Sequence, residues 1–336
     1  MREESVIAEK ARMFKVSVVI PTYNRLMRLK QVLSALAEQS YPLADFEVIV
    51  VSDGSSDGTH EYVNHLVMPY RLALVTQANQ GPATARNTGI AHSSGEYILF
   101  IDDDVVPAAQ LIAEHMALHE QAGADVVVLG PMLTPDDFRM SPWVRWEQAM
   151  LMKQYQSMQK GRWQPSPRQF YTGNTSLARR HLNASGGFDP AFRRAEDVEL
   201  AYRLASHNLR FVFHPAAVGY HYAERSFRSW IETPYTYGRN EVIFARDKQQ
   251  MWLLPAVYEE FHHRHPIVRA LVRVCLDRRS ISKGVVAWLR VLGQQSDRFG
   301  IERMVEMTHS GMFNLRYYQG IADELGGRKI FLSQVQ

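Results

Sequence analysis

The sequence predicts an α/β fold with a mixed, mostly parallel sheet flanked by helices. Two observations lead to this prediction. Short β-branched runs alternate with helical patterns over the first 130 residues, and turns rich in Asp, Gly and Asn follow those runs. After residue 230 the alternation stops and the pattern is helical throughout. Alternating strand and helix signals are typical of a parallel sheet covered by helices, so we expect an α/β region followed by a helical C-terminal extension.

Each expected strand is a short run of apolar and β-branched residues, and each expected helix has an apolar face. The strands are expected at 16–20, 46–52, 71–77, 96–101 and 124–129, and the helices at 25–39, 58–66, 82–93 and 107–121. The first helix should turn one side to the core, formed by Leu26, Leu29, Val32, Leu33 and Leu36.

Residues 131–171 differ from the preceding chain because they are rich in Trp, Met, Gln and Pro. Two interpretations stay open. The segment is either an irregular connection with one helix, or a mobile wall over a site in which Trp143, Trp146 and Trp163 act as stacking surfaces.

Bulk composition narrows the function classes. The 336 residues are 46% hydrophobic and 22% charged, as in a soluble protein with a substantial core. A net charge of +3 gives no reason to expect a nucleic-acid partner. The single Cys275 excludes an internal disulfide framework. The charged N-terminus lacks the apolar core of a signal peptide, and no apolar stretch approaches the ~20 residues of a membrane span. We therefore expect a cytoplasmic protein.

Segment 261–290 is strongly basic, with seven Lys and Arg against the single acidic residue Asp277. Val, Leu and Ile are interleaved with these cations. The segment is either a solvated helix face, or a basic amphipathic surface that contacts anionic lipid at the inner face of a membrane.

Three consecutive aspartates, Asp102, Asp103 and Asp104, follow the apolar run EYILFI. Ligands of such folds gather where the carboxyl ends of the strands lie. Clustered carboxylates there suit a hard divalent cation that keeps positions for substrate phosphates. Alternatively, the aspartates cap a helix that begins near Pro107. Capping accounts for one aspartate but not for three.

A second acidic group lies in the predicted helix within 193–210. On a helical wheel, Asp197 falls in the middle of an apolar arc, whereas Glu196, Glu199 and Arg203 fall on the polar side. The arc consists of Val198, Leu200, Ala201, Leu204 and Ala205. A carboxylate on a buried face is costly unless it is paired or used. Asp197 is either a satisfied first-turn aspartate or a general base tuned by burial.

Two glycine-bearing turns complete the pattern. SDGSSDG offers Asp53 as a hydrogen-bond acceptor for a base or ribose, or is only a tight turn. NQGPATARNTG offers Asn79, Gly81 and Arg86 to a uracil ring or a diphosphate, or is only the start of a helix. Neither GxGxxG after a strand nor GxxxxGK[ST] is present, which argues against dinucleotide and P-loop sites.

Taken together and in order, these stretches resemble the family 2 glycosyltransferases with the GT-A fold, a Rossmann-like nucleotide-diphospho-sugar transferase fold. The resemblance covers roughly residues 15–225. It rests on VSVVIPTYNR, FEVIVVSDGSSDGT, NQGPATARNTGIAHSSGEYILFIDDD, TGNTSLARRHLNASGGFDPAFRRAEDVELAYRL and FVFHPAAVGYH.

The resemblance implies a GT-A domain over 1–225, with a nucleotide-binding half at 15–130 and an acceptor and catalytic half at 131–225, and a helical extension over 226–336. It also implies a role for each matching residue. Nucleotide-sugar binding falls to Pro21, Thr22, Tyr23, Asp53, Asn79, Arg86, Asp102 and Asp103. Asp104 and Asp102, with His221, would hold Mn²⁺ or Mg²⁺, although three aspartates leave the register of the D-x-D pair open by one. Asp197 would be the catalytic base and Glu196 the reserve candidate. The sugar and acceptor would meet Gly173, Asn174, Gly187 and Trp163.

The implied activity is inverting, metal-dependent transfer of a sugar from a nucleotide-diphosphate sugar, with UDP the expected nucleotide, to a hydroxyl of a sugar, lipid-linked or other acceptor. Surface polysaccharide or glycoconjugate synthesis is the expected setting. The alternatives are a catalytically inactive nucleotide-sugar-binding protein and a sugar nucleotidyltransferase. The sugar, the acceptor, the metal and the oligomeric state stay open.

Overall fold

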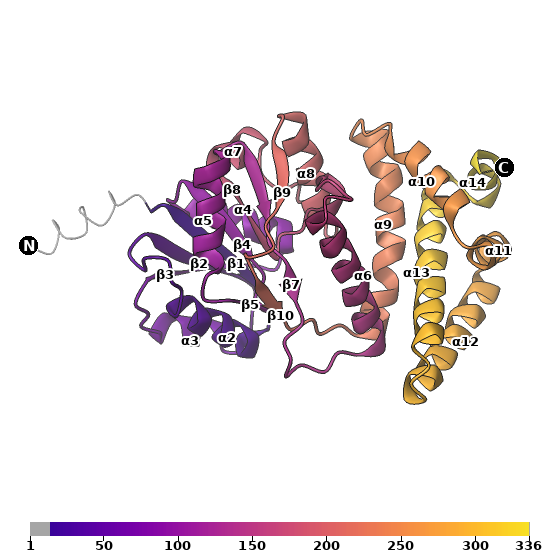
Figure 1. The fold of residues 1–336 in the computed structure, drawn as a ribbon, viewed down its shortest axis with the longest axis horizontal. Helices are drawn as coiled ribbons and strands as arrows, with labels where there is room; N and C mark the ends of the chain where they lie inside the picture. The colour runs from indigo at the N-terminus through magenta and orange to yellow at the C-terminus, as the bar shows by residue number, and fades with distance from the viewer. Residues whose placement is uncertain (1–13, 336) are drawn as a thin grey trace, which may run out of the picture. The chain divides into compact units, whose positions relative to one another are not determined.

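The computed structural model describes residues 14–335, so residues 1–13, most of the N-terminal segment considered above, lie outside the described part of the chain. The described chain forms two compact units. The first contains residues 14–138 and 152–222, and the second contains residues 139–151 and 223–335. Figure 1 shows a sheet with helices in the first unit and helices alone in the second.

A seven-stranded sheet forms the centre of the first unit, with strand order β3-β2-β1-β4-β8-β6-β9. Its strands are β1 (Val16–Thr22), β2 (Phe46–Asp53), β3 (Arg71–Gln77), β4 (Tyr97–Ile101), β6 (Val126–Leu129), β8 (Asn174–Ala178) and β9 (Arg210–Phe213). Strands β1 to β4 run parallel, and β6 runs parallel to β9. Only β8 is antiparallel to its neighbours β4 and β6. The prediction of a mixed, mostly parallel sheet is confirmed.

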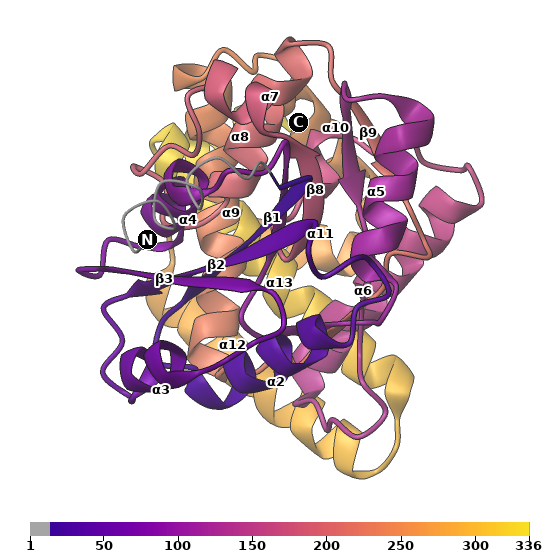
Figure 2. The same ribbon diagram turned by 90° about the vertical axis from the view of Figure 1, so that its left-hand side faces the viewer.

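Helices cover both faces of this sheet because successive residues of the buried strands point to opposite sides. In β2, Val48 and Val50 belong to the cluster that contains α2, whereas Ile49 and Val51 pack with Ala85 of α4. Figure 2 shows α2 and α3 on one face and α4 on the other. The helices of this unit are α2 (Leu26–Ala37), α3 (Thr59–His65), α4 (Pro82–His92), α5 (Leu111–Ala122), α7 (Arg179–Ala184) and α8 (Glu196–Ser206), with a 3-10 turn at Pro167–Gln169.

The predicted face of α2 is largely confirmed. Four of its five residues are buried, and only Leu26 is partly exposed. The helix expected from residue 107 begins instead at Leu111, because residues before it pair in a second sheet.

That second sheet is small and has the order β5-β10-β7. It consists of β5 (Val105–Pro107), β7 (Met132–Leu133) and β10 (Gly219–His221). His221 is the register partner of Val105, the residue directly after the three aspartates. The sheet therefore brings a late histidine to the end of β4, and Pro107 ends a strand rather than starting a helix.

The second unit is helical, as predicted for the chain after residue 230. Its helices are α9 (Phe227–Asp247), α10 (Leu253–His263), α11 (Pro266–Cys275), α12 (Arg279–Arg298), α13 (Glu302–Leu325) and α14 (Arg328–Gln334), and α6 (Pro142–Gln159) begins in it. Gly238 of α9 and Gly320 of α13 let the two backbones approach closely, since a Cβ at either position would lie 2.0 Å from a carbonyl oxygen of the other helix. No helix among the described residues is both long and apolar enough to span a bilayer.

Segment 131–171 is mainly an irregular connection with one long helix, α6, preceded by the short strand β7. Trp143 packs on Phe227 and Trp146 on Trp230, with ring centroids 5.4 and 6.0 Å apart. These two partly buried tryptophans pack against the apolar core of the second unit, which favours the first of the two interpretations, an irregular connection with one helix.

Candidate active site

The three aspartates leave β4 at the edge of the sheet where β1 and β2 also end, and the middle one is built into that edge. Thr22, the last residue of β1, donates a hydrogen bond from Oγ1 to Asp103 Oδ2 (2.7 Å). Burial raises the pKa of the Asp103 carboxyl to about 7, although the nearby Arg25 charge opposes the rise. Asp103 therefore ties the end of β4 to the end of β1.

Asp104 lies between two basic side chains. Arg25 Nη1 contacts its Oδ2, and His221 Nε2 lies 3.5 Å from its Oδ1. The backbone N–H of Tyr222 donates to the Asp104 carbonyl (2.9 Å), which fixes the histidine strand against the aspartate. Burial opposes ionisation of Asp104, but the contacts with His221 and Arg25 outweigh it and lower the pKa of this carboxyl to about 2. Asp104 is thus a buried carboxylate that is held ionised.

Arg86 of α4 joins two acidic residues that are far apart in the sequence. Its Nη2 lies 2.8 Å from Asp102 Oδ1, and its Nη1 lies 2.7 Å from Glu196 Oε1. The residue is 5% exposed. Burial disfavours its charge, yet Asp102 and Glu196 outweigh that effect and raise the pKa of the guanidinium above its usual value. Arg86 therefore links the aspartate cluster after β4 to the first turn of α8.

Asp197, the next residue of α8, is partly exposed, and its Oδ1 accepts a hydrogen bond from the N–H of Val198 (2.9 Å). Burial, together with the charge of Glu196, raises the pKa of the Asp197 carboxyl to about 7 although the Arg86 charge opposes the rise. A carboxylate with a pKa near neutrality can take up a proton at physiological pH.

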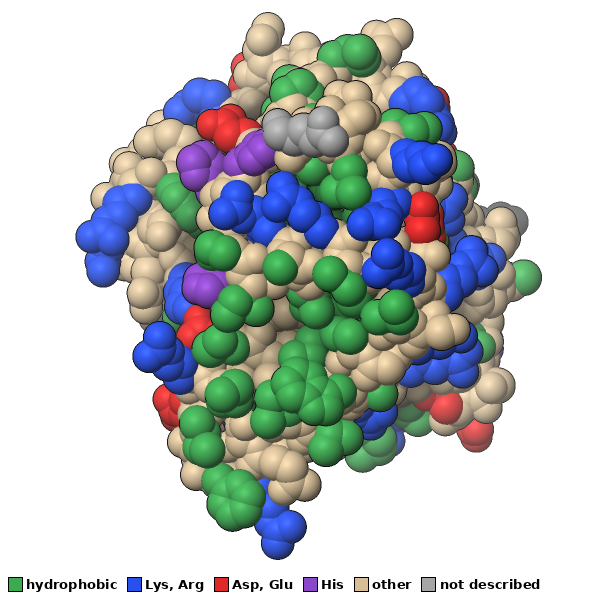
Figure 3. All heavy atoms as spheres, turned by 90° about the vertical axis from the view of Figure 1, so that its right-hand side faces the viewer, with side chains coloured by type: hydrophobic (Ala, Val, Ile, Leu, Met, Phe, Trp, Pro, Cys, Tyr) green, Lys and Arg blue, Asp and Glu red, His purple; other side chains and the backbone are tan. Residues whose placement is uncertain are grey.

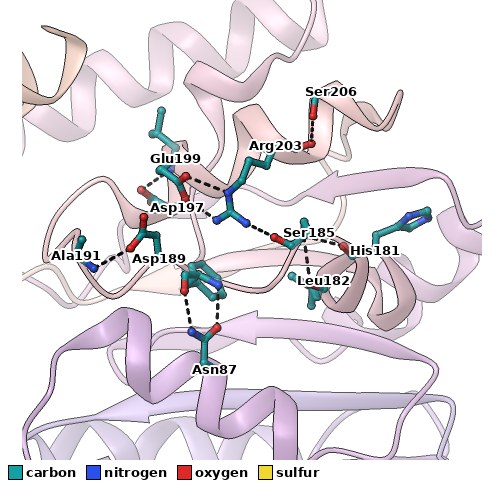
Figure 4. Close-up of polar contacts among 12 residues, drawn as sticks. Asn87, His181, Leu182, Ser185, Asp189, Ala191, Asp197, Glu199, Arg203 and Ser206 are labelled. Carbon is teal, nitrogen blue, oxygen red and sulfur yellow. Dashed lines mark hydrogen bonds and ion pairs between the residues drawn. The ribbon is translucent and has the colours of Figure 1, made fainter. Parts of the chain in front are cut away.

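Two glutamates of this helix were predicted to lie on its polar side, and for both the prediction is wrong. Glu196 and Glu199 are 7% and 2% exposed, although the wheel placed them toward solvent. Glu196 is buried because it is paired with Arg86. Glu199 is buried because Arg203 holds both its oxygens, at 3.0 and 2.5 Å. Figure 4 shows Arg203 lying between Glu199 and Ser185, whose carbonyl it also contacts.

The GGFD turn before α8 is fixed to α4 by one side chain. Asn87 Nδ2 donates to the carbonyl of Phe188, and the Phe188 N–H donates back to Asn87 Oδ1, both at 2.8 Å (Figure 4). Gly187 has φ +73° and lies so close to Asn87 that a Cβ would be 2.5 Å from its Oδ1. Glycine is therefore required at Gly187 by backbone conformation and by space.

Asp53 organises the loop that leads into α4. Its Oδ1 accepts hydrogen bonds from Gln77 Nε2 and the N–H of Gln80, and its Oδ2 accepts one from the N–H of Gly81, all at 2.8 Å. Asn79 in this loop is exposed, as is Tyr23 after β1, and Pro21 is partly exposed. Asn79 and Tyr23 are therefore available at the surface, whereas the Asp53 carboxylate is largely occupied by two backbone N–H groups and the Gln77 side chain.

The other residues that were predicted to contact the sugar or the acceptor lie in different environments. Gly173 lies beside the aspartates, since a Cβ there would be 3.1 Å from Asp102 Oδ2. Asn174 is fully buried, and its Nδ2 donates to the carbonyls of Pro131 and Ala217. Its side chain is thus occupied in holding two loops to strand β8. Trp163 is 51% exposed, and its indole makes no hydrogen bond within residues 14–335.

Two residues of this site were not singled out from the sequence. Arg25 belongs to PTYNR, and its proximity to the aspartates follows only from the neighbouring positions of β1 and β4. Asn87 follows Arg86 directly, but its partner Phe188 lies 101 positions away. For Arg25 the sequence did carry a signal, because a charged residue ends the PTYNR stretch.

The donor atoms around Asp104 fit a hard divalent cation. Carboxylate oxygens suit Mn²⁺ and Mg²⁺, imidazole nitrogen also ligates Mn²⁺, and such ions commonly combine one or two protein ligands with substrate phosphates. Asp104 and His221 already face each other, while Asp102 turns to Arg86. Within the described residues no three His, Cys, Asp or Glu converge as a complete protein site, so substrate oxygens and water would have to supply the remaining positions.

Comparison with known proteins decides the family. The family model "Glycosyl transferase family 2" matches residues 17–186, which is half of the chain. The chain belongs to glycosyltransferase family 2. The match confirms the resemblance drawn from the motifs.

Relatives and solved structures agree with this membership. The chain is 33% identical over 219 residues to validoxylamine A glucosyltransferase of Streptomyces hygroscopicus subsp. jinggangensis, covering 58% of this chain and 52% of that protein. The matched region thus spans about half the length of that relative.

Two solved structures are similar in fold. TarS of S. aureus in complex with UDP-GlcNAc has a TM-score of 0.59 at 19% identity, covering 91% of this chain and 90% of that chain. Mannosyltransferase PcManGT from Pyrobaculum calidifontis in complex with GDP-Man and Mn²⁺ has a TM-score of 0.58 at 20% identity, covering 92% and 88%. The GT-A fold class is confirmed.

Proposed function

We propose that this family 2 protein transfers a sugar from a nucleoside-diphosphate sugar to an acceptor hydroxyl, with inversion at the anomeric carbon. One observation carries the proposal. Buried Arg86 joins Asp102, at the tip of β4, to Glu196, the neighbour of Asp197. A donor-binding carboxylate cluster and a carboxylate with the pKa of a general base are thereby held in one network.

The donor is proposed to be UDP-linked. TarS binds UDP-GlcNAc and PcManGT binds GDP-Man, and both share the fold of this chain. Exposed Tyr23 and Asn79 would contact the base and ribose, together with Pro21, Thr22 and Asp53. A GDP-linked sugar is the second candidate because PcManGT uses a similar fold for it.

Asp104 and His221 would hold Mn²⁺ or Mg²⁺, and Asp102 would lie in or beside the metal shell. When bound, this ion would neutralise negative charge on the departing diphosphate, an electrostatic contribution that is usually large. The protein's own part is to keep Asp104 ionised for that purpose, which the contacts with His221 and Arg25 achieve.

Asp197 is proposed to take the proton from the acceptor hydroxyl as its oxygen attacks the anomeric carbon. Glu196 is a poor alternative, because its Oε1 is occupied by the ion pair with buried Arg86. The turn clamped by Asn87 would position the sugar near Asp197 through Gly187 and its neighbours.

The test compares wild-type protein with Asp197→Asn, which keeps the shape and removes the base. A thermal-shift panel of nucleotide sugars with and without Mn²⁺ first identifies the donor, since a ligand that binds the native state raises its melting temperature. With that donor, Asp197→Asn should retain the shift and lose transfer by about three orders of magnitude or more. Retained turnover in Asp197→Asn would show that Asp197 is not the general base.

The same experiments separate the alternatives. A nucleotide-sugar-binding protein without catalysis would show the thermal shift but no metal-dependent transfer in the wild-type chain. A sugar nucleotidyltransferase would release pyrophosphate rather than a nucleoside diphosphate.

We further propose surface polysaccharide or glycoconjugate synthesis as the setting, with a sugar or lipid-linked acceptor. Gly173, which lies against Asp102, would face the donor sugar.

A further inference from the structure

The second unit exposes an apolar surface on its two amphipathic helices α11 and α12 and on the turn after them. Figure 3 shows hydrophobic side chains gathered on this face of the unit. Single exposed apolar residues are ordinary, but a contiguous group on one face marks an interaction site. The side chains concerned are Ile267, Val274, Ile281, Trp288, Val291, Phe299 and Ile301, all between 46% and 73% exposed. We call this set the apolar patch.

The apolar patch follows from the helical period. On α11, Ile267 and Val274 are seven residues apart and share the outward face, while Val272 and Cys275 are buried. On α12, Ile281 and Trp288 repeat the same spacing. Each helix therefore has a second apolar side besides the one that packs inward, and this side is not needed for the core.

Cations border the apolar patch. Lys and Arg side chains form a band along one side of the hydrophobic area in Figure 3. Arg278 directly precedes α12 and Arg279 is its first residue, and both are exposed. Within residues 14–335, neither has a carboxylate within ion-pair distance. The nearest acid in sequence, Asp277, instead accepts a hydrogen bond from the N–H of Arg328 (2.9 Å).

We propose that the apolar patch docks on the surface of an anionic lipid bilayer. The combination of apolar side chains, an exposed Trp and uncompensated Lys and Arg is what an interfacial helix presents to a membrane. Trp favours the level of the lipid headgroups, and a basic border attracts acidic lipids. This inference goes beyond the proposed sugar transfer and does not depend on it.

A second copy of the chain fits the surface less well. A two-fold interface would place the same patch on both subunits. The unpaired cations at Arg278 and Arg279 would then face or flank like charges, which disfavours association. A bilayer that contains acidic lipid supplies the opposite charge and an apolar layer together.

The test is flotation of the full chain with vesicles. Wild-type protein should float with phosphatidylcholine vesicles that contain phosphatidylglycerol, bind far less to pure phosphatidylcholine, and dissociate in part at high salt. Arg278→Gln/Arg279→Gln should lower the partition coefficient about 25-fold, since each cation near an acidic surface contributes roughly fivefold. Trp288→Ser should lower it roughly tenfold or more.

Matched controls lie in the first unit. Val67→Ser removes an apolar side chain that is 92% exposed, and Arg162→Gln/Arg210→Gln removes two exposed cations. Both variants should float like wild type. Equal flotation of wild type and Trp288→Ser would overturn the proposal. Absence of flotation together with a concentration-dependent dimer that Trp288→Ser abolishes would also overturn it, and would assign the patch to a second copy. Melting temperatures of all variants show that each one is folded.

Discussion

Replacing Arg86 by methionine tests the link between the aspartate cluster and α8. The variant Arg86→Met keeps most of the side-chain volume and removes the guanidinium. Two carboxylates, Asp102 and Glu196, then lose their common partner. The Glu196 side chain is 9% exposed and cannot turn to water without moving α8, whereas the Asp102 side chain is 36% exposed and can be partly solvated.

The expected loss of stability follows from these exposures. Removing one partner of a buried ion pair typically costs about 3–5 kcal/mol, because the other charge stays buried and unpaired. Since Asp102 regains water, we expect the lower end, about 3 kcal/mol. For a unit of about 200 residues this corresponds to a fall in melting temperature of roughly 6–12 °C.

Thermal and urea unfolding of wild type, Arg86→Met and Arg86→Met/Glu196→Gln provide the measurement. The double variant should recover part of the loss because it removes the orphaned buried charge. If Arg86→Met lies within 1 kcal/mol of wild type, or the double variant is no better, the ion-pair argument is refuted.

Two further predictions concern the chemistry. The pKa of Asp197 is raised to about 7, so its base form is depleted below that pH, and kcat/KM should fall about tenfold per pH unit there and level off above it. A profile that is flat between about pH 5 and 8 would show that Asp197 does not act as a base in this way. Arg25→Met should increase Mn²⁺ affinity about tenfold in the absence of donor, because Arg25 contacts Asp104 and competes for it. Titration followed by electron paramagnetic resonance measures this, with Arg28→Met as the matched arginine control, and equal affinities in Arg25→Met and wild type would contradict the competition.

Local patterns in the sequence predicted most of the sheet. The runs that became β1, β2 and β3 are seven or eight residues long, and their apolar periodicity is strong enough to be recognised without tertiary information. Strands β8 and β9 of the main sheet were not predicted. Strands β5, β7 and β10 were missed because they have only two or three residues each. Their existence depends on pairing between Val105 and His221, which no local pattern reveals.

The candidate site was predictable in its residue types more than in its connections. The motifs pointed to the aspartates, Arg86 and Asp197. They could not show that Arg86 pairs with Glu196, because the two are 110 positions apart. For the same reason the helical wheel put Glu196 in solvent, and it also put Glu199 there although the partner of Glu199, Arg203, lies only four residues further along α8. A wheel treats every carboxylate as polar, whereas a carboxylate can be buried where an arginine partner offsets part of its desolvation cost.

The pairing of Arg86 with Glu196 rather than with Asp197 explains how two adjacent carboxylates can have different roles. An Asp197 paired directly with Arg86 would be held ionised, with a low pKa and little tendency to accept a proton. Because α8 begins at Glu196, directly after Ala195 with its φ of +59°, the glutamate is the residue that meets Arg86. Asp197 then experiences burial and the charge of Glu196, both of which raise the pKa of its carboxyl. The same arginine that fixes α8 to the aspartate cluster thereby leaves the neighbouring carboxylate basic enough to take a proton from a hydroxyl.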